Sequence, residues 1–234
     1  MNGAMSTDVV CGMKVAHRIG CGDESVVREV LRDDTYGLRQ LGLIGSPVVV
    51  DIGAHIGCFS LLAHSVLRPS LLLAYEPESE NFKLLTTNIA ANRVTEAKLV
   101  MAAVTGSGGG VRMSLHKGSS GCHSLATRRS DSFVDVASVA FDDVVRDVAA
   151  VDVLKIDCEG SEYSVFRAAS DASIAKVMTI VMEFHEFGDL GEKAEDLFSL
   201  LRSKGFVAPV KERWLSRRRS GRCGIAVFRR PGNA

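Results

Sequence analysis

Short apolar runs alternate with stretches of helical periodicity from Val48 towards the end of the chain. Apolar runs of this length, bounded by glycines and polar residues, are typical of buried strands, and longer periodic stretches are typical of amphipathic helices. Their alternation predicts βαβ units and an α/β fold built on a parallel sheet. The predicted strands are 48–52, 71–75, 98–104, 151–156 and 177–184, and the predicted helices are 58–67, 79–92, 142–148, 161–169 and 193–204.

The region before Val48 departs from this alternation. Residues 24–41 have helical character, and they are followed by a break that contains Gly42, Gly45 and Pro47. Glycine and proline interrupt helices and mark turns. The sequence therefore predicts an N-terminal cap or lid segment over residues 1–46, followed by a single domain over residues 47–234.

Two later regions also depart from the alternation of strands and helices. Strands predicted at 111–115 and 134–139 enclose a polar loop rich in glycine and serine, 116–131. A loop of this length inside a compact domain is usually functional or mobile. Near the end of the chain, apolar runs at 206–210 and 224–228 predict a terminal hairpin.

The amino-acid composition limits which binding partners and which cellular location are expected. The 28 Lys and Arg residues balance the 28 Asp and Glu residues, so no overall field attracts nucleic acid or an anionic membrane, and nucleic acid is not the expected partner. The first ten residues do not resemble a secretory signal, and no apolar stretch reaches the roughly 20 residues that span a bilayer. We therefore expect a cytoplasmic protein without a membrane span; its oligomeric state has no signal in the sequence.

The loop after the first predicted strand carries the clearest ligand signal. Residues 51–57 read Asp-Ile-Gly-Ala-His-Ile-Gly. In α/β sheets, ligands bind at the carboxyl ends of strands, where glycines allow close approach and helix N-termini offer free N–H groups. An acid before the first glycine would repel the pyrophosphate of NAD, whereas it suits the ammonium of a methionine group. The loop therefore favours S-adenosylmethionine over a dinucleotide.

A second acid follows the next predicted strand, in Tyr75-Glu76-Pro77. A carboxylate at this place can accept hydrogen bonds from both ribose hydroxyls. One such acid is weak evidence because acids at strand ends also stabilise helix N-termini, but two on neighbouring strands indicate a nucleoside cofactor. The expected cofactor contacts are Asp51, Gly53, Ala54, His55, Ile56, Gly57, Glu76, Pro77, Ala103 and Asp157, with His55 contributing its backbone.

Acidic residues and a histidine follow the last two predicted parallel strands, where an acceptor would need a base. Glu183 and His185 are separated by one residue, so their side chains point to the same side of a strand. With an ordinary pKa of about 6.5, His185 is the preferred general base, and a purely structural histidine is the main alternative. Asp157, Glu159 and Glu183 complete the candidate catalytic set. The group of Asp157, Glu183 and His185, with Glu159 nearby, also suits Mg²⁺ or Mn²⁺, although no spacing defines a metal site.

Five further stretches of the chain form a recognisable set: 49–57, 75–77, 140–144, 154–162 and 181–185. Together they resemble the FkbM family of methyltransferases. The resemblance spans about residues 23–228, and it implies a Rossmann-like class I methyltransferase with a seven-stranded, mostly parallel sheet and an antiparallel terminal strand. It also implies methyl transfer to oxygen, commonly a hydroxyl of a sugar, glycolipid or secondary metabolite. Phe141 replaces the family's usual leucine and Cys158 a common aliphatic residue.

The segment 211–222 supports the alternatives to this reading. It holds six basic residues and the single tryptophan, Trp214, and the hairpin prediction places it in the terminal loop. Such a segment suits an anionic acceptor or RNA, although a solvated charged loop is the simpler interpretation. Methylation of nitrogen or of RNA therefore stays open, as does a cofactor-binding scaffold without catalysis.

Overall fold

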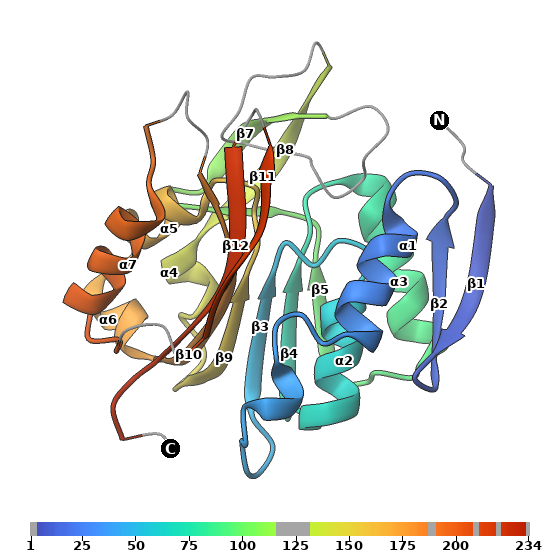
Figure 1. Cartoon of the computed structure of the whole chain (residues 1–234), viewed down its shortest axis with the longest axis horizontal. Helices are drawn as coiled ribbons and strands as arrows, with labels where there is room; N and C mark the ends of the chain where they lie inside the picture. The colour runs from blue at the N-terminus through green and yellow to red at the C-terminus, as the bar shows by residue number, and fades with distance from the viewer. Residues whose placement is uncertain (1–3, 116–131, 187–190, 208–210, 219–220, 233–234) are drawn as a thin grey trace.

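The computed structural model describes residues 4–115, 132–186, 191–207, 211–218 and 221–232 (Figure 1). Its centre is a seven-stranded sheet with the order β11-β12-β10-β9-β3-β4-β5. Five of these strands are parallel, β12 runs antiparallel to β10, and β11 pairs antiparallel with β12 at the edge. The strands are β3 (Val48–Ile52), β4 (Leu71–Tyr75), β5 (Ala97–Val100), β9 (Val151–Ile156), β10 (Val177–Glu186), β11 (Lys211–Arg218) and β12 (Gly221–Arg229). The expected mostly parallel, seven-stranded α/β architecture is confirmed.

Helices cover both faces of this sheet (Figure 1). One face carries the N-terminal segment with α2 (Cys58–Leu67) and α3 (Ser79–Ala91), and each face has its own apolar core. Strands covered on both sides read as nearly continuous apolar runs, which is why they were recognisable in the sequence. The other face carries α4 (Phe141–Val144), α5 (Glu162–Ala168), α6 (Asp171–Ala175) and α7 (Ala194–Ser203). No helix within the described ranges has the length and apolar character needed to cross a membrane.

The N-terminal segment differs from its prediction. The single helix expected over 24–41 is wrong: α1 (Asp23–Val26) continues into a π-helical turn, η1 (Val27–Arg32), and a separate 3₁₀ turn follows, η2 (Leu38–Gln40). The chain turns between them because Asp34 and Gly37 adopt left-handed conformations, with φ of 48° and 74°. The Asp34 carboxylate then accepts the backbone N–H groups of Leu38 and Arg39 at the start of η2.

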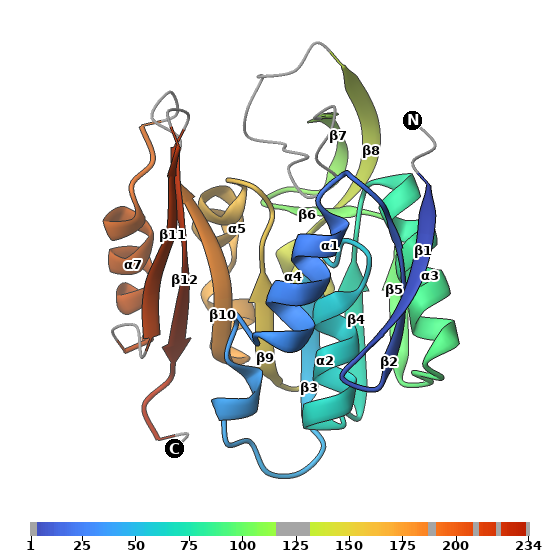
Figure 2. The same cartoon turned by 45° about the vertical axis from the view of Figure 1, so that its right-hand side comes forward.

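A hairpin that the sequence did not reveal precedes α1. It consists of β1 (Met5–Val10) and β2 (Met13–Arg18), and it lies beside α3 (Figure 2). The amides of Asn88 and Asn92 fix it to α3, since each bonds both the N–H and the C=O of one β2 residue, Ala16 and Lys14 respectively. The hairpin is therefore tied to the main sheet through α3.

The middle of the chain forms a second, three-stranded sheet above the carboxyl ends of the central strands (Figures 1 and 2). The strand predicted at 98–104 is divided: β5 ends at Val100, and β6 (Ala103–Thr105) pairs with β8 (Phe133–Ala140). Strand β7 (Gly109–Ser114) completes the order β6-β8-β7. The loop predicted at 116–131 lies outside the residues that the structure describes.

The C-terminal hairpin exists, but its first strand begins later than predicted. Phe206 follows α7 as a buried residue whose N–H bonds Leu201, and β11 starts only at Lys211. The strand prediction is therefore wrong for residues 206 and 207, and its remainder, 208–210, lies outside the residues that the structure describes. The basic segment 211–222 forms β11 and the start of β12 rather than the hairpin loop.

Candidate active site

The point where the sheet order reverses lies between β3 and β9. Strand β3 comes first in the chain among the sheet strands, β4 and β5 extend the sheet on one side of it, and β9 and β10 extend it on the other. Ligands of open α/β sheets bind at the carboxyl ends of the strands at such a switch point. The loops that meet there are 53–57 after β3 and 157–161 after β9.

The two glycines of the first loop allow it to pack closely. Gly53 has a φ of 76°, and a Cβ on it would lie 1.8 Å from the carbonyl oxygen of Asp157. Gly57 has a φ of 92°, and a Cβ there would lie 2.8 Å from a methyl group of Leu85 in α3. Both positions thus require glycine so that the loop can contact its neighbours, the β9 loop and α3.

Asp51 is fully buried beneath this loop. One carboxylate oxygen accepts a hydrogen bond from the Ser60 hydroxyl at 2.7 Å, and the other lies 3.3 Å from the Lys155 ammonium. Lys155 also donates to the carbonyl oxygens of Ile52 and Gly53. Burial lowers the pKa of Lys155, but Asp51 and Asp157 outweigh it and the net shift is upward. The direct contacts of Asp51 are therefore internal, and they fix the start of the loop.

Asp157, at the end of β9, has the more accessible carboxylate. Its side chain is 24% exposed, it lies 3.7 Å from Lys155, and it accepts a hydrogen bond from the Tyr36 hydroxyl at 2.9 Å. Burial and the charge of Asp157 raise the pKa of Tyr36 well above its ordinary value, so the tyrosine remains a hydrogen-bond donor. An accessible carboxylate at the switch point can accept hydrogen bonds from an ammonium group and pair with its charge.

Glu76 lies at the tip of β4, next to the same loop. One oxygen accepts the His55 N–H at 2.8 Å, and the other accepts the Glu78 N–H at 2.9 Å and the Asn81 amide at 3.3 Å. Burial raises the pKa of Glu76 to about 7, against the opposing effect of these hydrogen bonds. The structure thus places Glu76 and Asp157 at neighbouring strand ends, on either side of β3.

The remaining predicted cofactor residues have mainly structural surroundings. Ala54 and Ile56 are buried in the core of the α2 face, and Pro77 is half-buried before α3. Ala103 is buried in β6, where it pairs with Ser138 of the small sheet. His55 has a φ of 52°, and its backbone N–H donates to the Glu76 carboxylate.

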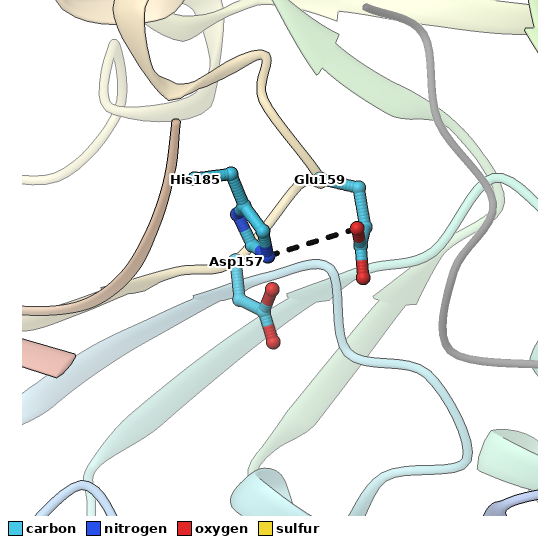
Figure 3. A group of neighbouring side chains, drawn as sticks. All are labelled: Asp157, Glu159 and His185. Atoms are coloured by element: carbon cyan, nitrogen blue, oxygen red, sulfur yellow. Dashed lines mark ion pairs between the residues drawn. The ribbon is translucent and has the colours of Figure 1, made fainter. Parts of the chain in front are cut away.

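The candidate catalytic residues come together around His185 (Figure 3). Its Nδ1 lies 3.2 Å from the Glu162 carboxylate, and its Nε2 lies 3.6 Å from both Glu159 and Glu183. Burial opposes protonation of the ring, but the three carboxylates raise the pKa of His185 well above its ordinary value. The carboxylates around the ring therefore favour the protonated form of His185, in which both ring nitrogens carry a proton.

Two carboxyl groups of this cluster titrate close to neutral pH. Burial raises the pKa of Glu159 to about 8 and that of Glu183 to about 7, with the charge of His185 acting in the opposite direction. Glu159 also has a left-handed backbone with a φ of 51°. Such strain in a non-glycine residue is concentrated at functional sites. Either carboxyl group can exchange a proton near neutral pH.

A divalent cation also fits the distances in this cluster. Asp157, Glu159 and His185 each offer one ligand atom, and these atoms lie within 4.8 Å of one another. The oxygen and imidazole donors suit Mg²⁺ or Mn²⁺. As described, however, both ring nitrogens of His185 face carboxylates, so a cation would have to replace the ion pair with Glu159.

Several site residues were missed in the sequence. Lys155 carried a signal, because it is a lysine within the apolar run of β9 that ends next to an acid. Tyr36 carried none, since it meets Asp157 across 121 positions of the chain. The same holds for Arg18, whose side chain bonds Asn81, and for Asp23, whose carboxylate lies 3.5 Å from the His55 imidazole. Both residues reach the site because the hairpin folds onto α3.

Comparisons with known proteins identify the family of this chain. The family model described as Methyltransferase FkbM domain matches residues 51–208. The 31-O-demethyl-FK506 methyltransferase FkbM of Streptomyces tacrolimicus is 28% identical to this chain, over 86% of it and 88% of that protein. Methyltransferase sdnD of Sordaria araneosa is 24% identical, over 77% and 81% of the two chains.

Solved structures show the same fold. The methyltransferase FkbM from Methylobacillus flagellatus superposes with a TM-score of 0.52 at 18% identity, covering 79% of this chain and 45% of that one. A precorrin-6y C5,15-methyltransferase from Geobacter metallireducens also gives 0.52, at 14% identity, covering 86% and 87% of the two chains. The expected class I methyltransferase fold is therefore confirmed.

Proposed function

This chain belongs to the FkbM methyltransferase family and is an S-adenosylmethionine-dependent methyltransferase, and we propose that it methylates a hydroxyl oxygen of a small molecule. A sugar, a glycolipid or a secondary metabolite is the proposed acceptor class. The observation that carries the proposal is the partly buried carboxyl group of Glu159, which lies 3.6 Å from His185 beside the switch point of the sheet and whose pKa burial raises to about 8. A related enzyme, FkbM of Streptomyces tacrolimicus, acts on an oxygen according to its name.

Two carboxylates of the site suit the two ends of the cofactor. Glu76 would accept the ribose hydroxyls, and Asp157, rather than the enclosed Asp51, would accept the methionine ammonium. The surplus of carboxylates over cations around Lys155 and His185 complements the positive sulfonium and ammonium groups. When bound, S-adenosylmethionine supplies an electrophilic methyl group.

Glu159 is the proposed general base of the transfer. A hydroxyl is a weak nucleophile, so its proton must leave as the new oxygen–carbon bond forms. Glu159 accepts that proton once it is ionised, and the adjacent imidazolium of His185 orients its carboxylate. We propose Glu159 in place of His185, the base preferred from the sequence, because the neighbouring carboxylates raise the pKa of that ring and favour its protonated form.

We expect labelled methyl transfer from S-adenosylmethionine to hydroxylated small molecules in an acceptor screen analysed by mass spectrometry. The modified products should carry the methyl group on oxygen. Transfer to an amine or to RNA would contradict the proposed acceptor, and RNA binding that weakens with salt and with alanines at Arg217, Arg218 and Arg219 would support the RNA alternative. Cofactor binding without any product would favour a scaffold.

Replacing Glu76 by glutamine should raise the Kd of S-adenosylhomocysteine about tenfold, because a charged acceptor for the ribose hydroxyls is lost. The wild-type affinity should rise with pH through about 7, where Glu76 gives up its proton, and this rise should be absent in Glu76→Gln. Calorimetric titrations between about pH 5.5 and 8.5 measure both effects. The exposed Glu80→Gln serves as the control. Equal affinity of Glu76→Gln and wild type would remove Glu76 from the site.

A further inference from the structure

We propose that the N-terminal segment, residues 4–46, is a fixed wall of the cofactor site that orients the carboxylate at each end of it. In this proposal Tyr36 positions Asp157, and Arg18 positions Glu76 through Asn81. The inference rests on the proposed function, in which Asp157 binds the methionine end of the cofactor and Glu76 the ribose. It assigns positioning roles to residues that lie before the part of the chain matched by the family model.

A closed ring of polar contacts holds Glu76. The guanidinium of Arg18, the last residue of β2, donates two hydrogen bonds to Asp23 at 2.9 and 3.2 Å and one to the Asn81 side-chain oxygen at 2.5 Å. Asn81 in turn donates to Glu76. On the other side of the ring, Asp23 lies 3.5 Å from the His55 imidazole, and the backbone N–H of His55 bonds the second Glu76 oxygen.

This ring is well shielded from solvent. Asp23 is fully buried, and only 15% of the Arg18 side chain is exposed. A charged hydrogen bond in such surroundings is stronger and more directional than one on the surface. The ring therefore limits the rotation of the Glu76 carboxylate and presents it in one orientation to a ligand at the end of β4.

Tyr36 acts at the other end of the site. Its hydroxyl donates to Asp157, while its ring packs edge-on against Phe59 of α2, with centroids 5.4 Å apart and planes at 89°. The Lys155 ammonium lies 5.8 Å from the same ring. Because Phe59 and Lys155 fix the tyrosine ring, its hydroxyl donates to a single oxygen of Asp157. The second oxygen of Asp157 can then accept hydrogen bonds from a ligand.

The segment that carries these residues is anchored on the sheet. Its apolar residues share one core with α2 and α3, and η1 and η2 pack on α2 (Figure 2). The hydrogen bonds from Asn88 and Asn92 hold β2 on α3. Opening the segment as a lid would expose this core and break the buried contacts of Arg18 and Tyr36. We infer a wall that stays in place when the cofactor exchanges.

The affinities for two ligands report separately on the two ends of the site. S-adenosylhomocysteine contains both the ribose and the amino-acid part, whereas methylthioadenosine lacks the ammonium and the carboxylate. We expect Tyr36→Phe to raise the Kd of S-adenosylhomocysteine about tenfold and to leave that of methylthioadenosine unchanged. Arg18→Ala should raise both Kd values by a similar factor, and the milder Arg18→Lys should raise both by less. Calorimetry gives the affinities, and thermal unfolding identifies any variant that does not fold.

Matched variants and double variants complete the experiment. Tyr163→Phe removes a buried hydroxyl that has no partner within the described chain, and Lys14→Ala removes an exposed charge from the same strand as Arg18; both should bind like wild type. A positioning residue acts through its target, so Tyr36→Phe should add nothing to Asp157→Asn, and Arg18→Ala nothing to Glu76→Gln.

The outcomes distinguish this inference from the function on which it rests. If Asp157→Asn and Glu76→Gln weaken binding while the Tyr36 and Arg18 variants resemble their controls, only the wall is overturned. Additive double variants, or a Tyr36→Phe effect equal for both ligands, overturn it as well. If Asp157→Asn and Glu76→Gln leave both affinities unchanged, the proposed placement of the cofactor fails, and the inference fails with it.

Discussion

Replacement of Glu159 by glutamine is expected to lower kcat by about 10²–10³-fold, with little change in the Kd of S-adenosylmethionine. Glutamine keeps the size of the side chain but cannot accept the hydroxyl proton. The pH profile should change as well: because burial raises the pKa of Glu159 to about 8, the wild-type kcat should rise with pH through that value. Above it the group is ionised and can act as a base. Glu159→Gln should lose this rise, as measured in steady-state assays across the pH range.

A matched substitution and a second site variant make this result specific. Glu195→Gln changes an exposed acid of α7 and should behave like wild type. If His185 were the base instead, His185→Gln would abolish the rise with pH and Glu159→Gln would retain it. The same assay after treatment with EDTA tests the cation alternative at Asp157, Glu159 and His185, since activity lost with EDTA and restored by Mg²⁺ or Mn²⁺ would favour that alternative.

The core of the fold was predictable because its elements are periodic and bounded. Strands 48–52 and 71–75 and helix 58–67 have the predicted limits, since each is an apolar or amphipathic run between glycine, proline or charged residues. The position of strand β11 was predicted wrongly because this strand is not an apolar run. It is rich in charged residues and lies at the edge of the sheet, whereas the apolar run 206–210 looks more like a strand. Edge strands often carry charges, which prevent pairing with other chains.

The candidate site was predictable only as far as it lies on strand ends. The tips of parallel strands meet at one edge of a sheet, so the acids at or near the ends of β3, β4, β9 and β10 were expected to converge. The sequence could not show which acid is accessible: Asp51 is enclosed by Ser60 and Lys155, while Asp157 is partly exposed. That difference depends on side-chain packing, and the contacts from the N-terminal segment depend on a hairpin without a sequence signature.

Replacement of Lys155 by methionine should lower the free energy of unfolding by about 3–5 kcal/mol, which is the usual effect of leaving one member of a buried ion pair without its partner. Lys155 is 3% exposed and lies 3.3 Å from the Asp51 carboxylate, which has no exposed surface. Methionine has a similar volume but offers no charge and no donor to Ile52 or Gly53. In a chain of this size the loss corresponds to a decrease in Tm of about 10 °C, measurable by calorimetry.

A double variant shows whether the Asp51–Lys155 pair itself explains this loss. Lys155→Met combined with Asp51→Asn should be less destabilised than Lys155→Met alone, because an amide costs much less to bury than an unpaired carboxylate. The exposed Lys83→Met in α3 should stay within about 0.5 kcal/mol of wild type. A loss below about 1 kcal/mol for Lys155→Met would mean that water reaches Asp51. In that case Asp51 would be accessible enough to bind the methionine ammonium directly, and the assignment of that contact to Asp157 would have to change.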